Sequence, residues 1–148
     1  MMKLILAVFL SFVLLLVVVL AGVDSKSENS YVQCSVAIKQ KSLRPGTATQ
    51  LLISLRPKKG IHINLDPPLQ VKLDSAEIVS SVGKPEIPRR DTVLDLSKPV
   101  RLSVTISPKA KPGSFTVRGT VTYFYCSETE GWCSRFKQPI EFKLTVVR

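Results

Sequence analysis

The sequence holds a single histidine, His62, and only three cysteines among its 148 residues. A metal site built from histidines alone is therefore excluded, and a histidine-dependent catalytic triad has one candidate base. Acidic residues are also few, because 11 Asp and Glu stand against 21 Lys and Arg, for a net charge of +10. This balance raises nucleic acid, an anionic lipid surface and an acidic protein as classes of partner.

Long amphipathic helices are also missing. No hydrophobic period of the helical kind lasts longer than a turn, and ten prolines leave little room for helices. The length is that of one ordinary domain, which excludes a multidomain machine. A composition of 45% hydrophobic and 22% charged residues is typical of a globular domain and argues against a disordered or collagen-like chain.

Residues 1–23 are set apart from the rest by their lack of charge. Lys3 is the only charged residue before Asp24, and residues 4–23 form one apolar run. The run is typical of a secretory signal peptide, with cleavage after Ala21, but about 20 apolar residues also suffice for an N-terminal membrane anchor. Both alternatives export the domain to the periplasm or another extracytoplasmic space. The polar residues 24–30 would then be a short tether.

Export changes the expected chemistry and partners. An oxidising compartment allows cysteines to pair, and we expect no nucleic-acid partner outside the cytosol. The excess of basic residues then indicates a solvated surface, or one attracted to anionic lipid or an acidic protein.

From residue 31 onward, apolar and polar residues alternate with a period of two. This alternation is typical of antiparallel sheets with one buried face, and Pro- and Gly-containing turns separate the segments. The sequence therefore predicts an all-β domain over residues 31–148, an immunoglobulin-like antiparallel β-sandwich of seven or eight strands. Residues 82–98 are predicted to be the longest irregular stretch, a surface loop able to cover a site. The alternating segments are Val32–Ile38, Leu51–Leu55, Leu69–Leu73, Val100–Ile106, Phe115–Tyr125 and Ile140–Val146.

Two cysteines carry the candidate chemistry. Cys126 and Cys133 flank six residues at the end of the strongest predicted strand, and Gly131 gives the intervening segment the freedom to turn back. In an exported protein the pair is expected to form a disulfide. So short a loop limits its stabilising effect to roughly 2–3 kcal/mol. A structural bond and a redox-active bond both remain open at this point.

The segment Val121-Thr-Tyr-Phe-Tyr-Cys126, followed by Gly131-Trp-Cys133, resembles the N-terminal periplasmic domain of the thiol:disulfide interchange protein DsbD. The stretch from Lys59 to Asn64, with Pro67-Pro68, is also similar, and the resemblance covers roughly residues 31–147. It implies an immunoglobulin-like domain without cofactor or metal. Such a domain passes electrons between thioredoxin-like partners and depends on a separate membrane electron donor.

The resemblance also implies roles for the two cysteines. Cys133 would form the mixed disulfide with a partner, and Cys126 would be the resolving cysteine. Arg135 and Lys137 would favour the thiolate of Cys133, or else belong to a solvated strand edge. The insert between the cysteines is one residue longer than in the family pattern.

A second departure from the family concerns shielding of the disulfide. The family covers its disulfide with a loop that carries an aromatic residue, and residues 82–92 contain none. Ile87 and Pro88 are the apolar residues that would form a lid in its place.

Four further residues have open roles. His62 either lies beside the disulfide or has a surface role, and Tyr125 and Trp132 serve either core packing or recognition of a partner. Cys34 is expected to be buried like a small hydrophobe, with pairing to another chain as the alternative. A zinc site of the three cysteines and His62 is disfavoured by the wide spacing of Cys126 and Cys133.

Two other functions compete with thiol–disulfide exchange. One is a non-enzymatic extracytoplasmic binding or assembly module, in which the disulfide only holds a loop. The other is an anchored accessory subunit that docks a partner through its positive charge.

Overall fold

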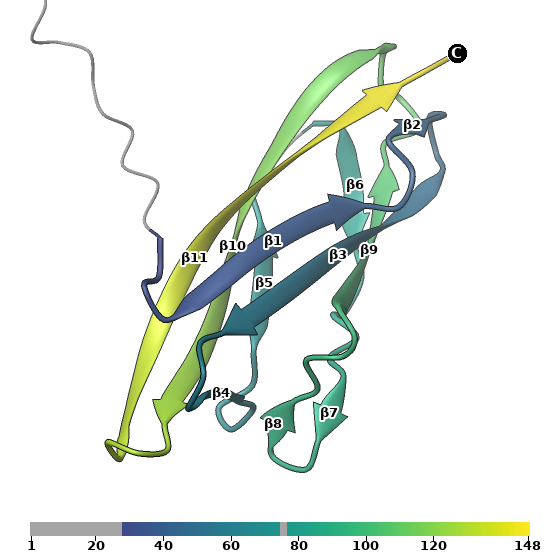
Figure 1. Ribbon diagram of the computed structural model, residues 1–148. Helices are drawn as coiled ribbons and strands as arrows, with labels where there is room; N and C mark the ends of the chain where they lie inside the picture. Colours follow the sequence, from purple (N-terminus) through teal and green to yellow (C-terminus); the bar gives the residue numbers. More distant parts are fainter. Residues whose placement is uncertain (1–27, 75–76) are drawn as a thin grey trace, which may run out of the picture.

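The computed structural model describes residues 28–74 and 77–148, which form two β-sheets packed as a sandwich (Figure 1). The predicted all-β, immunoglobulin-like antiparallel sandwich is confirmed, with strands running from Val32 to Val146. The predicted signal or anchor segment, residues 1–23, and residues 24–27 of the predicted tether lie outside the described residues. Within the described ranges no helix has the length and apolar character needed to cross a bilayer.

One sheet has four strands in the order β1 (Val32–Ile38), β3 (Ala48–Pro57), β9 (Val100–Ile106) and β6 (Val79–Val82). All neighbouring strands within this sheet are antiparallel to each other. β3 and β9 lie at its centre and bury every second side chain, as their alternating sequences predict.

The other sheet is built around the two longest strands, β10 (Gly113–Ser127) and β11 (Trp132–Val146). Beyond β10 come β4 (Ile61–Asn64), β8 (Val93–Leu94) and β7 (Arg89–Arg90), and β5 (Gln70–Leu73) also pairs with β10. The short β2 (Ser42–Leu43) pairs with the end of β11 and is parallel to it, whereas the other pairs are antiparallel.

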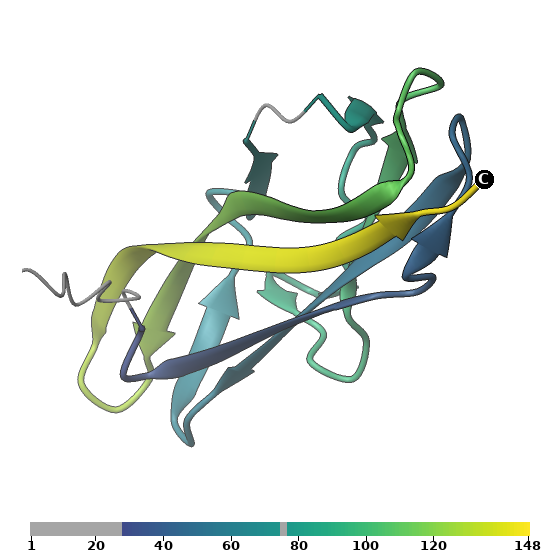
Figure 2. The same ribbon diagram turned by 90° about the horizontal axis from the view of Figure 1, so that it is seen from above.

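The core lies between the two sheets and consists of the predicted apolar faces. Figure 2 shows β10 and β11 crossing one layer while β1 and β3 cross the other. Cys34, expected to be buried, packs against this core but is only half-buried. It belongs to β1, which is an edge strand and therefore has a neighbouring strand on one side only. The largest fully buried side chains are those of Tyr123, Leu51, Ile53, Ile63, Leu102, Ile106 and Leu144.

The stretch 82–98 is more ordered than predicted. Val82 ends β6, Glu86 forms a bridge with Arg101 of β9, and β7 and β8 make a small hairpin that joins the edge of β4. Strands of two residues contain no alternation, so a period-two search does not detect them. The same reason explains why seven or eight strands were predicted and eleven are found among the described residues.

A single hairpin, made of β10 and β11, runs the length of the domain. Its register is unbroken over fifteen residue pairs, from Gly113 opposite Val146 to Ser127 opposite Trp132. The tip of this hairpin and the C-terminus lie at opposite ends of the molecule (Figure 1). Whatever the tip carries is therefore held by a long, continuous ladder.

Tyr123 is the largest of the fully buried side chains, and its hydroxyl oxygen accepts a hydrogen bond of 3.1 Å from the Asn29 side-chain amide. Burial raises the pKa of Tyr123 from 10.0 to about 12, against the opposing effect of the Asn29 hydrogen bond. The folded chain therefore keeps this proton at a pH where the unfolded chain has lost it.

This difference predicts a loss of stability at alkaline pH. The stabilisation is complete below pH 10 and is lost as the pH rises towards 12, because only the unfolded state releases the proton. Between pH 9 and pH 11 the free energy of unfolding should fall by about 1.4 kcal/mol more in the parent protein than in Tyr123→Phe. Urea unfolding of both proteins at each pH measures this difference. Equal slopes would contradict the assignment to Tyr123.

Candidate functional site

The predicted disulfide is present at the tip of the β10–β11 hairpin. Cys126 and Cys133 lie directly opposite each other in the ladder, with their Cα atoms 4.1 Å apart and their sulfurs 2.04 Å apart. This Cα separation is close to the ~4.5 Å of a non-hydrogen-bonded antiparallel pair. The bond therefore joins adjacent strands of one sheet and does not connect the two sheets.

A four-residue turn follows the last pair of the hairpin. Gly131 has a φ of 68°, which confirms the predicted use of its backbone freedom, and its amide donates to the Ser127 carbonyl at 3.0 Å. The Glu130 amide donates to the Ser127 hydroxyl at 3.2 Å. The Glu128 amide donates to the Gly60 carbonyl at 3.1 Å and so ties this turn to the one before β4.

The two cysteines differ sharply in exposure. Cys126 is 5% exposed, since β10 has strand neighbours on both sides, β11 and β4. Cys133 is exposed, because β11 has a strand neighbour on one side only at this end of the sheet. A reagent in solution therefore meets Cys133 more readily than Cys126.

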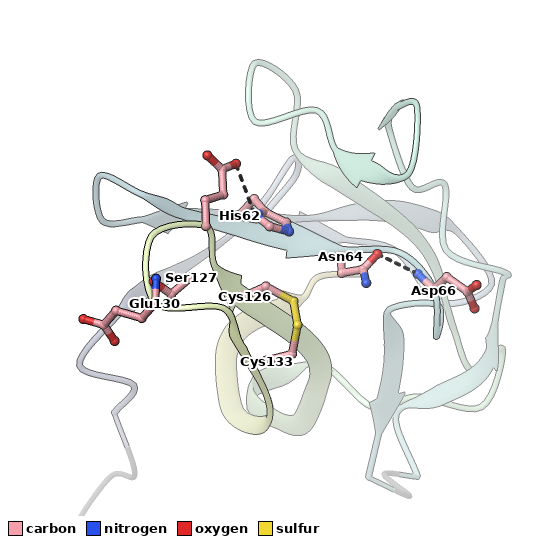
Figure 3. The surroundings of a disulfide bond; sticks show 8 residues. His62, Asn64, Asp66, Cys126, Ser127, Glu130 and Cys133 are labelled. Carbon is pink, nitrogen blue, oxygen red and sulfur yellow. Dashed lines mark hydrogen bonds and ion pairs between the residues drawn. A yellow bond between two sulfur atoms is a disulfide. The ribbon is translucent and has the colours of Figure 1, made fainter.

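His62 lies next to the disulfide, which is one of the two predicted alternatives. In β4 it stands directly opposite Cys126, and opposed residues of antiparallel strands share a sheet face with Cβ atoms about 4.5–5.5 Å apart (Figure 3). Its Nδ1 is 3.3 Å from Oε1 of Glu128. The two atoms are within ion-pair distance, but their geometry is not that of a hydrogen bond. Nδ1 has no hydrogen-bond partner among the described residues. The His62 side chain is 30% exposed, so it borders solvent as well as the disulfide.

Tyr125 and Trp132 lie on the other face of the same hairpin. Their positions in the ladder are one residue away from the cysteines, so their side chains point towards the core side while the disulfide is on the outer side. Their rings meet edge to face, with the ring centroids 5.7 Å apart. The ring centroid of Tyr31 is 5.2 Å from that of Trp132 and 5.9 Å from that of Tyr125. Of the two predicted roles, the geometry corresponds to packing beneath the hairpin.

Ile87 and Pro88 are not brought to the cysteines. Ile87 packs on the core, and both residues line a surface pocket together with Lys98, Pro99 and Arg101. Cys133 is exposed to solvent, so no lid covers it in the described part of the chain.

Three further residues, Arg135, Lys137 and Phe124, lie near Cys133 on the same face of the sheet as the disulfide. Arg135 and Lys137 follow it at alternate positions of β11 and are exposed, as the predicted strand edge requires. Half-buried Phe124 stands opposite Arg135 in β10. Sequence reasoning missed Phe124, although counting by two from Cys126 places it on the face of the disulfide.

No group of three or more His, Cys, Asp or Glu residues that could hold a metal ion exists within residues 28–74 and 77–148. The site itself offers the two sulfur atoms of the disulfide, with one imidazole and two cations nearby. No known family model matches this chain, and a search of curated proteins finds no related sequence.

Proposed function

We propose that the domain is an extracytoplasmic thiol–disulfide exchange module that passes electrons between thioredoxin-like proteins and a membrane electron donor through Cys126 and Cys133. The observation that carries the proposal is the unequal exposure of the pair, since Cys133 is open to a partner and Cys126 is 5% exposed. Exchange depends on which sulfur a thiolate can reach. The resemblance to the DsbD domain supports the same assignment of roles.

The exchange proceeds through a mixed disulfide. A partner thiolate attacks Sγ of Cys133, a bond forms between these two sulfurs, and the Cys126–Cys133 bond breaks. Its electron pair leaves with Cys126, whose thiolate takes up a proton. A second thiolate of the partner then attacks the partner's own sulfur and releases Cys133, so the partner leaves as a disulfide and the domain holds two electrons. The reverse sequence passes these electrons to an acceptor disulfide.

The fold suits repeated opening of this bond. The ladder of β10 and β11 continues for thirteen pairs below the cysteines, and β4 holds the other side of Cys126. A bond worth roughly 2–3 kcal/mol is a small addition to that framework. The dithiol form should therefore keep its fold. His62, beside Cys126, is placed to exchange the proton that Cys126 gains and loses.

The reduction potential tests the proposal. The full chain, kept soluble with a mild detergent, is equilibrated in graded mixtures of reduced and oxidised glutathione, alkylated, and read by peptide mass. We expect a value above about −230 mV, in the range of exchange proteins. A value below about −300 mV marks a structural bond and favours the competing function of a non-enzymatic binding or assembly module.

A further inference from the structure

Beyond exchange itself, the part of β11 that follows Cys133 carries two exposed positive charges, those of Arg135 and Lys137. On β11, Cys133, Arg135 and Lys137 follow one another at alternate positions and share the outer face of the sheet. Alternate residues of a strand are about 7 Å apart, so both cations lie within about 14 Å of the Cys133 backbone. Neither cation forms an ion pair within the described residues.

Acidic side chains also lie near this row, among them that of Glu28, which lines a surface pocket together with Gln138 and Pro139 of β11. The carboxylate of Glu128 is directed at His62, and that of Glu130 accepts a hydrogen bond from the Trp132 indole. Asp66 lies beyond the end of β4, and β10 separates β4 from β11 (Figure 3). Further along β11, Glu141 is bound to Arg118 at 3.3 Å. These contacts leave the carboxylates charged, so negative charges of the turn lie on one side of Cys133, and the cations of Arg135 and Lys137 lie on the other side, along β11.

An apolar side chain completes the surface. Half-buried Phe124 lies opposite Arg135, two positions from Cys126 on the same face. An exposed cysteine, an aromatic ring and two cations thus lie on one face at the open edge of the sheet.

We propose that Arg135 and Lys137 select exchange partners that carry carboxylates around their reactive cysteine. The inference rests on the proposed exchange function and adds the chemistry of the partner's surface. Opposite charges next to the reacting sulfurs raise the encounter rate, and like charges lower it, with both effects weakened by salt.

Two small disulfides of opposite charge test the selection. The reduced full chain, with Cys34→Ala so that only the pair carries thiols, is oxidised by glutathione disulfide, which is anionic, or by cystamine, which is cationic. The ratio of the two rates is compared in the parent, in Arg135→Glu/Lys137→Glu, and in Lys143→Glu. Because both probes meet the same thiols, a changed thiol reactivity cancels in the ratio. Lys143 is a matched control, since it is exposed on the same strand and face, about 34 Å from Cys133.

We expect the double variant to lower the anionic-to-cationic rate ratio by about tenfold or more at low salt, and Lys143→Glu to leave it within about twofold of the parent. A ratio unchanged in the double variant, or lowered as much by Lys143→Glu, overturns the selection while leaving exchange in place. If no protein reacts with either probe, the exchange function fails and the selection with it.

The competing possibility is that Arg135 and Lys137 lie against an anionic lipid surface. The full chain is reconstituted in vesicles of phosphatidylcholine with or without phosphatidylglycerol, and oxidation by glutathione disulfide is followed. If Arg135 and Lys137 select protein partners, the anionic lipid should change the oxidation rate of the parent and of the double variant by the same factor. If the anionic lipid slows the parent but not the double variant, the row lies against lipid and the proposal is overturned.

Discussion

Cys126→Ser should arrest exchange at the mixed disulfide, whereas Cys133→Ser should nearly abolish it. In the first variant the exposed Cys133 still attacks a disulfide, but no resolving thiol remains to release the adduct. In the second, the remaining thiol of the pair belongs to Cys126, which is 5% exposed, and we expect its reaction with glutathione disulfide to be about a hundredfold slower, with Cys34→Ala present in both variants. Peptide mass mapping of the reduced, full-length variants gives both the rate and the position of the adduct.

The two variants are each other's control. Both remove the same bond, so both lose the same contribution to stability, roughly 2–3 kcal/mol. A difference in rate therefore reports on access and not on folding. Equal rates for the two variants would contradict the assignment of Cys133 as the attacked residue. A stable adduct on Cys126 in the parent protein would reverse the two roles.

Gly119→Val should be strongly destabilising although it leaves the cysteines untouched. Gly119 stands opposite Leu73 of β5, and a Cβ there would lie 2.5 Å from the Lys72 carbonyl oxygen and 2.8 Å from the Leu73 side chain. The carbonyl is backbone and cannot move aside without breaking the β10–β5 pairing. We expect a loss of about 3 kcal/mol, the upper part of the range for over-packing.

Urea unfolding of Gly119→Val and of Thr116→Val measures this loss. Thr116 is exposed on the same strand, so the same incoming side chain should change its free energy of unfolding by less than about 0.5 kcal/mol. A Gly119→Val protein as stable as the Thr116→Val control would show that β5 shifts at no cost.

The main strands could be predicted from the sequence because each buries one face. In β9, for example, Val100, Leu102, Val104 and Ile106 are all buried, which fixes the period of two regardless of the rest of the fold. The short strands could not be predicted in this way. β7 and β8 are each only two residues long, and β8 joins the sheet through β4, which lies about thirty residues away in the chain.

In the candidate site, too, some features could be predicted from the sequence and others could not. Cys126 and Cys133 are close in sequence, and a turn between them was enough to predict their bond. The position of His62 opposite Cys126 depends on the register of β4 against β10, which joins segments more than sixty residues apart. That register is set by packing of the whole sandwich, so the sequence left the role of His62 open. The opposite faces of Phe124 and Tyr125, by contrast, were within reach of simple alternation.

The closeness of the two cysteines along the chain also affects how reliably the correct bond forms during oxidation. Cys126 and Cys133 are 7 residues apart, whereas Cys34 precedes them by about 90 residues. In an unfolded chain, closing the longer loop costs about 2 kcal/mol more conformational entropy. The native pair should therefore meet some tens of times more often than either cysteine meets Cys34. Oxidation of the unfolded chain then favours the native bond before any strand has formed.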